Sequence, residues 1–92
     1  MLVLENCSCV YGFIPDESDF DNLTQDLLEI QLDNGIIIDV GWYPEHDPQG
    51  QYYTHVFKET WENQLFGPVM NSRKEDVEDL VQWLITIFKE TK

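Results

Sequence analysis

The sequence predicts an α+β fold: an antiparallel sheet of about five strands, arranged as a meander around a central hairpin, with one C-terminal helix packed on one face. Three observations support this. Apolar and polar residues alternate along residues 28–32 and 36–42, which is typical of half-buried strands. Apolar residues recur at helical spacing in residues 77–88. The length of 92 residues, with 42% hydrophobic content, suits a single domain, residues 1–92, with one modest core.

The first strand is expected within residues 3–13, where the odd positions from residue 7 onward are apolar or aromatic and the polar residues Asn6 and Ser8 lie at even positions. Its half-buried face should carry Cys7, Cys9, Tyr11 and Phe13. In a strand, Cys7 and Cys9 point to the same side at a spacing poorly suited to bonding each other, so reduced thiols are expected.

Residues 16–26 contain five acidic residues and read as an exposed loop. In the alternative, Asp21 caps a short helix that starts there. A calcium-binding loop starting at Asp19 would need glycine where Thr24 stands and glutamate where Ile30 stands, so this motif is absent.

The central hairpin, residues 27–43, has its apolar residues at even positions on both strands. A loop of three residues, Asp33 to Gly35, keeps both apolar sets on one face if Gly35 has a positive φ. This register pairs Leu28 with Val40, Ile30 with Ile38 and Leu32 with Ile36. It also sets Glu29 directly opposite Asp39 on the other face, and like charges at such positions are destabilising.

The strands that follow are less sharply defined. Residues 44–50 form a wide turn and residues 51–59 a fourth strand, whose buried set is either Tyr52 with Val56 or Tyr53, His55 and Phe57. A turn at residues 59–63 then leads to a short fifth strand, residues 64–70, whose Pro68 suits a sheet edge.

The C-terminal helix is predicted to start at a capping box in which Ser72 is the N-cap and Glu75 bonds back to it. One helix face holds an apolar set widened by Trp83 and Ile87: Val77, Leu80, Val81, Leu84 and Phe88. One helix covers only one side of a sheet. The other side is therefore left to solvent or to a partner, with Glu29, Gln31, Ile37, Asp39 and Tyr43 on it.

The formal net charge of −13 is unevenly placed, because eleven acidic residues and no Lys or Arg precede Lys58. Such a surface repels nucleic acid and anionic membranes and attracts basic proteins. A basic protein partner is therefore expected, without direct nucleic-acid or membrane binding. The sequence lacks a span of roughly 18 apolar residues and a basic region before its first apolar residues, so a cytoplasmic location is expected.

The candidate partner-binding residues are the carboxylates of the exposed sheet face and the acidic loops, with one aromatic anchor: Glu29, Asp39, Tyr43, Glu45, Asp47, Asp16, Glu17, Asp19 and Asp21. The aromatic residues Trp42, Tyr52 and Tyr53 could serve as further anchors, although the even position of Trp42 places it in the core. No catalytic residue, metal site or cofactor is predicted. The two cysteines and two histidines lack the spacing of a zinc site.

The stretch IDVGWYPEHDPQG, followed by a strand, the tryptophan turn ETWEN and a C-terminal helix, resembles small uncharacterised acidic bacterial domains of the toxin-immunity type. The resemblance covers residues 28–90 and implies a stoichiometric inhibitor of a cognate toxin, such as a nuclease. Two alternatives remain: a phage-type DNA mimic that inhibits a nucleic-acid-binding protein, and a small enzyme that uses Glu29 and Asp39 as paired carboxylates.

Overall fold

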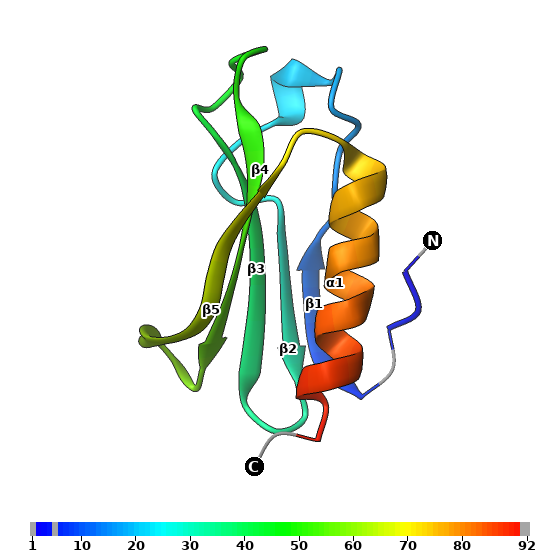
Figure 1. Ribbon diagram of the computed structural model, residues 1–92, viewed down its shortest axis with the longest axis vertical. Coiled ribbons are helices and arrows are strands. Elements are labelled where there is room, and N and C mark those ends of the chain that lie inside the picture. The colour runs from blue at the N-terminus through cyan, green and yellow to red at the C-terminus, as the bar shows by residue number, and fades with distance from the viewer. Residues whose placement is uncertain (1, 5, 91–92) are drawn as a thin grey trace.

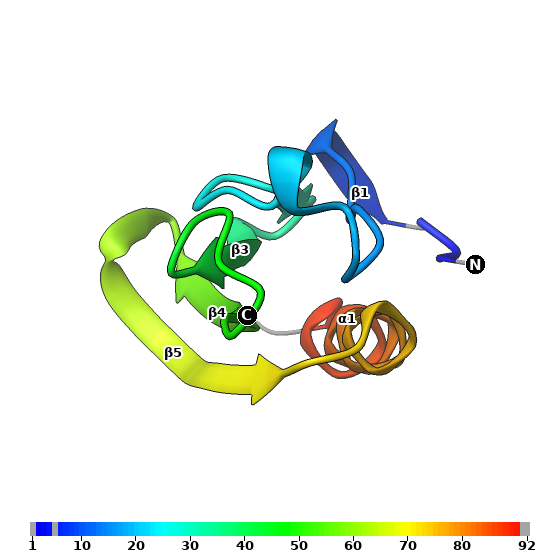
Figure 2. The same ribbon diagram turned by 90° about the horizontal axis from the view of Figure 1, so that it is seen from above.

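The computed structural model describes residues 2–4 and 6–90 and confirms the α+β fold (Figure 1). The strands form one antiparallel sheet in the order β1-β2-β3-β4-β5, so each strand pairs with its neighbour in sequence. The elements are β1 (Cys7–Gly12), β2 (Leu28–Leu32), β3 (Ile36–Tyr43), β4 (Gln51–Lys58), β5 (Thr60–Asn71) and α1 (Lys74–Phe88). Figure 2 shows β5 bending in an arc, with α1 on the side of the sheet between β1 and the C-terminal end of β5.

The predicted hairpin register is confirmed. Ile30 lies opposite Ile38, and Glu29 lies opposite Asp39. Gly35 has a φ of +87° and donates its N–H to the carbonyl of Leu32 at 3.2 Å, which closes the three-residue loop. The even-numbered residues of β2 and β3 consequently share one face.

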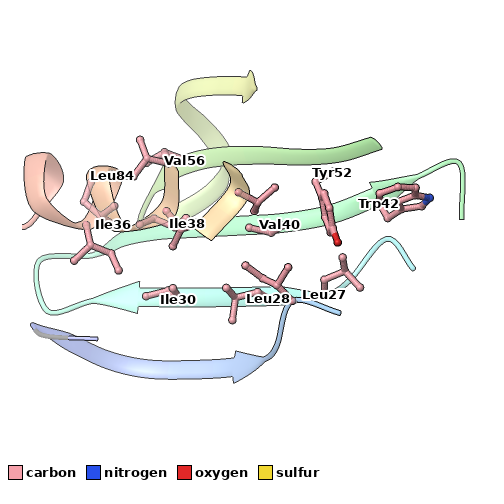
Figure 3. Packing of buried hydrophobic residues seen from close by; sticks show 14 of the residues in the cluster. Leu27, Leu28, Ile30, Ile36, Ile38, Val40, Trp42, Tyr52, Val56 and Leu84 are labelled. Carbon is pink, nitrogen blue, oxygen red and sulfur yellow. The ribbon is translucent and has the colours of Figure 1, made fainter. Parts of the chain in front are cut away.

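That face packs against α1 and forms the core (Figure 3). Of the two possible buried faces of β4, the one that carries Tyr52 and Val56 lies in the core. Tyr52, Thr54 and Val56 are fully buried there. Trp42 is also buried and packs edge-to-face on the ring of Tyr52, with ring centroids 4.9 Å apart. Tyr52 is therefore not a surface anchor; its hydroxyl donates to the carbonyl of Pro15 at 2.6 Å.

The helix buries a narrower face than predicted. Val77, Val81 and Leu84 are buried as expected, together with Ile85, which the prediction omitted. Leu80 and Phe88 are half-buried, and Trp83 and Ile87 are 52% and 44% exposed. The buried positions follow an i, i+4, i+7, i+8 stripe, so Trp83 and Ile87 lie beside the contact with the sheet.

The predicted capping box is wrong. The helix begins at Lys74, the N-cap is Arg73, and this N-cap makes no side-chain cap bond. The carboxylate of Glu17 instead accepts a hydrogen bond from the backbone N–H of Lys74, at 3.2 Å. A negative charge at a helix N-terminus satisfies an unpaired N–H and complements the helix dipole, so Glu17 replaces a local cap.

We predict that Glu17→Ala lowers the free energy of unfolding by about 1 kcal/mol, because it removes this acceptor. Ser72→Ala is the matched control and should change it by less than about 0.5 kcal/mol, as a surface substitution does. Urea denaturation of both variants measures the difference. A larger loss for Ser72→Ala than for Glu17→Ala would contradict the observed cap.

The predicted face of the first strand is wrong beyond Cys7. A bulge between Cys7 and Cys9 shifts the register, so Cys7 lies opposite Leu32 whereas Cys9 lies opposite Gln31 on the other face. The two thiols thus do not share a side. Tyr11 is 58% exposed, and Phe13, beyond the end of β1, is 62% exposed.

Two connections also differ from expectation. Strand β5 includes the predicted turn at residues 60–63, because the chain reverses at Glu59, which has a φ of +65°. Within the described part of the chain, β5 pairs with β4 alone, so Pro68 lies in an edge strand as predicted. Residues 18–26 are a loop with one 3₁₀ turn, Phe20–Asn22, so Asp21 lies within that turn and does not cap a helix.

Candidate functional site

The face of the sheet opposite α1, called the open face below, carries a row of polar and titratable side chains. The register sets Tyr11 opposite Glu29, Glu29 opposite Asp39, and Asp39 opposite His55. These four residues therefore cross four adjacent strands in one line. Of the predicted site residues, Glu29 and Asp39 are brought together as expected.

A chain crossing adds a third carboxylate to this row. A Cβ at Gly41 would lie 2.1 Å from the carbonyl oxygen of Gln25, so the backbone of residues 24–26 passes directly over this position. The crossing is held by the N–H of Trp42, which donates to the carbonyl of Thr24 at 2.8 Å. It places Asp26 close enough to Asp39 to raise the pKa of that carboxyl.

The three carboxylates surround a hollow of about 200 Å³, called the acidic hollow below. Its lining consists of Tyr11, Gly12, Asp26, Leu27, Leu28, Glu29 and Asp39. Among the described residues, no lysine or arginine lines it. Glu29 accepts a hydrogen bond from the side-chain amide of Gln31 at 2.6 Å, which is a neutral partner.

Asp39 is the most perturbed carboxyl of this hollow. Burial, followed by the charges of Asp26 and Glu29, raises its pKa to about 6. His55 lies opposite Asp39 on β4, and burial lowers the pKa of its imidazole. A positive charge on His55 that would compensate the charge of Asp39 is therefore disfavoured. The predicted repulsion between Glu29 and Asp39 is thus present and is increased by Asp26.

The sign of the pH dependence follows from this pKa. Between its ordinary value near 4 and about 6, the folded chain holds a proton on Asp39 that the unfolded chain has lost, so stability falls as the pH rises through this window. We predict that Asp39→Asn is more stable than the native chain at pH 7.5, by about 1 kcal/mol after allowance for solvent screening.

This gain should shrink as the pH falls from 6 to 4 and vanish below that window, because Asp39 is then protonated in both states. Urea denaturation of both chains at several pH values measures it. A gain that does not depend on pH would show that the carboxyl of Asp39 is not strained by its neighbours.

A second hollow, of about 480 Å³, lies on the same face at the end of the β2–β3 hairpin and is called the hairpin hollow below. Its lining consists of Ser8, Gln31, Leu32, Asp33, Gly35, Ile37, Glu59 and Trp61. Ile37 is only 7% exposed, so its predicted exposure on this face is wrong. The ring of Phe57, opposite Ile37, contacts Trp61 edge-on, with centroids 5.1 Å apart.

Tyr43 lies on the open face as predicted and is 37% exposed. Its ring packs edge-to-face on Tyr53, with centroids 5.2 Å apart. Burial raises the pKa of the Tyr43 hydroxyl, and the charges of Asp39, Asp26 and Glu45 raise it further. Tyr43 therefore lies between the carboxylates of the acidic hollow and the acidic loop at residues 44–50.

The loop acids lie at the end of the molecule where the 3₁₀ turn and the β3–β4 loop come together (Figure 1). The N–H of His46 donates to the carbonyl of Leu23 at 2.8 Å, and the ring of His46 bonds the carbonyl of Phe20. Glu45 accepts from the N–H of Gln25 at 3.0 Å, which ties the loop to the crossing segment.

Most predicted loop residues have structural partners within the chain. Asp16 accepts from Ser18, Asp19 from Asn22 and Asp47 from the N–H of Gln49, in addition to the cap formed by Glu17. Asp21 is exposed. The structure therefore separates the predicted set into loop acids that shape their own turns and carboxylates that converge on the open face.

Sequence reasoning missed Asp26, Asp33, Glu59, Tyr11 and Trp61 as members of this face. A signal for Asp26 was present, because a glycine inside a strand often marks the close approach of another backbone segment. Asp33 follows Glu29 and Gln31 at alternate positions, so parity also indicated it. Tyr11 depends on the bulge in β1, and Glu59 and Trp61 depend on the position of the β4–β5 reversal, which the alternation pattern does not show.

Among residues 2–4 and 6–90, no group of three or more His, Cys, Asp or Glu side chains is arranged to hold a metal ion. No helix in this part of the chain is both long and apolar enough to cross a membrane. Comparisons with protein-family models, curated proteins and solved structures give no significant match to this chain.

Proposed function

We propose that this protein is a non-enzymatic acidic binding module whose open face binds a basic protein, and that it acts as a bacterial immunity-type inhibitor of a basic partner such as a toxin nuclease. The observation that carries the proposal is the convergence of Asp26, Glu29 and Asp39 on a half-buried hollow lined by no basic side chain of the described chain. A cationic partner relieves their mutual repulsion on binding.

The small size of the acidic hollow and the exposed aromatic side chains on the same face favour protein binding over catalysis. At about 200 Å³ it is smaller than the roughly 300–1,000 Å³ of common small-molecule sites. The aromatic side chains beside the carboxylates, Tyr11, Tyr43 and Trp61, are each more than a third exposed. Exposed aromatic residues of this kind often act as anchors at protein interfaces.

The test is a charge reversal of the row, Glu29→Lys with Asp39→Lys, compared with a reversal on the helix, Glu75→Lys with Asp79→Lys. Glu75 and Asp79 are exposed on α1, away from the open face. A partner enriched from a native lysate is identified, purified and titrated against all three chains by calorimetry at low and moderate salt.

The open-face reversal should weaken binding by about 100-fold and reduce its salt dependence, whereas the helix reversal should weaken it by less than about fivefold. The open-face variant should also keep its native fold, because the carboxylate of Asp26 beside position 39 offers a counter-charge and long lysine side chains can extend their ammonium groups into solvent. Undiminished affinity of this variant would contradict the proposal. Capture of many DNA-binding proteins in place of one partner would favour the DNA-mimic alternative.

A further inference from the structure

Exposed aromatic rings stand beside carboxylates at two places along the open face. In the acidic hollow, Tyr11 adjoins Asp26, Glu29 and Asp39, and in the hairpin hollow, Trp61 lies with Asp33 and Glu59. The two rings are 58% and 51% exposed, so each forms an accessible wall. This combination distinguishes between the two basic side chains that a partner can present.

We propose that the partner binds the open face through arginine rather than lysine side chains, with one arginine in each hollow. The inference rests on the proposed function and specifies the partner's chemistry. A guanidinium group is planar, weakly hydrated and forked, so it can stack on a ring while it donates paired hydrogen bonds to carboxylates. A lysine ammonium feels the same field but remains strongly hydrated and gains less from the ring.

The strand geometry also sets the spacing of the two arginines. Glu29 in the acidic hollow and Asp33 in the hairpin hollow are four residues apart along β2 and its turn. At about 3.3 Å per residue, the hollows are roughly 13 Å apart. In an extended segment, residues i and i+4 point to the same side at this separation. The fitting occupant is therefore an extended segment with two arginines four positions apart.

The experiment uses capped peptides as probes and the full chain as receptor. The first probe is Gly-Arg-Ser-Thr-Ser-Arg-Gly, the second replaces both arginines by lysine, and the third moves the second arginine one position nearer, which turns it to the other side of an extended chain. Affinities are measured by NMR titration at low salt, where amide shifts also report the site.

The first peptide should bind about tenfold tighter than its lysine counterpart and several-fold tighter than the shifted one. Tyr11→Leu together with Trp61→Leu should remove the preference for arginine and leave the affinity for the lysine peptide within about twofold. Trp83→Leu is the matched control, because this ring is 52% exposed on α1, and it should leave the preference unchanged.

Each outcome separates this inference from the proposed function. Equal binding of the arginine and lysine peptides at the open face would overturn the arginine inference and leave a purely charge-driven surface in place. Binding of the arginine peptide that survives Glu29→Lys with Asp39→Lys would overturn it as well, because the site would then lie elsewhere. Loss of the preference in Trp83→Leu would assign it to the helix and contradict the proposal.

Discussion

Ile30→Asp is expected to leave the chain unfolded at room temperature. Ile30 has no exposed surface and lies between Val10 of β1 and Ile38 of β3 in the middle of the core. An ionised carboxylate there has no partner, which costs several kcal/mol, and the lost aliphatic side chain costs about 2–5 kcal/mol more. The sum is comparable to the roughly 5–15 kcal/mol by which a small domain is stable.

Circular dichroism and the dispersion of the amide NMR spectrum measure this outcome. Asn63→Asp introduces the same charge at an exposed position of β5 and should leave the chain folded. A folded Ile30→Asp chain with a native-like spectrum would mean that the even-numbered face of the hairpin is not the core.

The second large effect is expected for Gly41→Val. Strand propensity predicts that this substitution stabilises the fold, whereas the structure predicts that it destabilises it. Valine suits a strand and would on propensity alone add up to about 1 kcal/mol. The structure predicts instead that Gly41→Val lowers the free energy of unfolding by about 3 kcal/mol or more. The added Cβ would lie 2.1 Å from the backbone oxygen of Gln25, so the crossing segment must move and lose its bond to Trp42.

Gln51→Val is the control, since it places the same side chain on the open face at a half-exposed position of β4. It should change the free energy of unfolding by less than about 1 kcal/mol. Denaturant titration of the two variants compares them. A Gly41→Val chain as stable as the native one would show that residues 24–26 are not held over β3, and Asp26 would no longer belong to the acidic hollow.

The fold was predictable where the signal was local. The hairpin register followed from the parity of the apolar residues, which requires the three-residue loop Asp33 to Gly35, and the helix followed from its 3.6-residue period. The helix cap was not predictable, because its acceptor is Glu17, which lies 57 positions from Lys74 in sequence. The N-terminal end of the helix is therefore satisfied by a tertiary contact from Glu17 and not by the local capping box predicted at Ser72.

The candidate site was predictable only in its centre. The forced opposition of Glu29 and Asp39 could be read from the register, and the structure confirms it. The position of Tyr11 depends on the bulge after Cys7, which turns the later odd-numbered side chains of β1 to the open face. The alternation of apolar and polar residues does not indicate this bulge. Asp26 reaches the hollow through a crossing that only Gly41 indicates.

The most direct test of the central claim is amide hydrogen exchange of this chain, free and bound to the purified basic partner. The proposed surface predicts that slowed exchange and shifted signals concentrate at Tyr11, Glu29, Asp39 and Trp61 and at the crossing residues 24–26, while the exposed side of α1 around Trp83 is unchanged. Protection centred on α1, with the open face exchanging as in the free chain, would contradict the account.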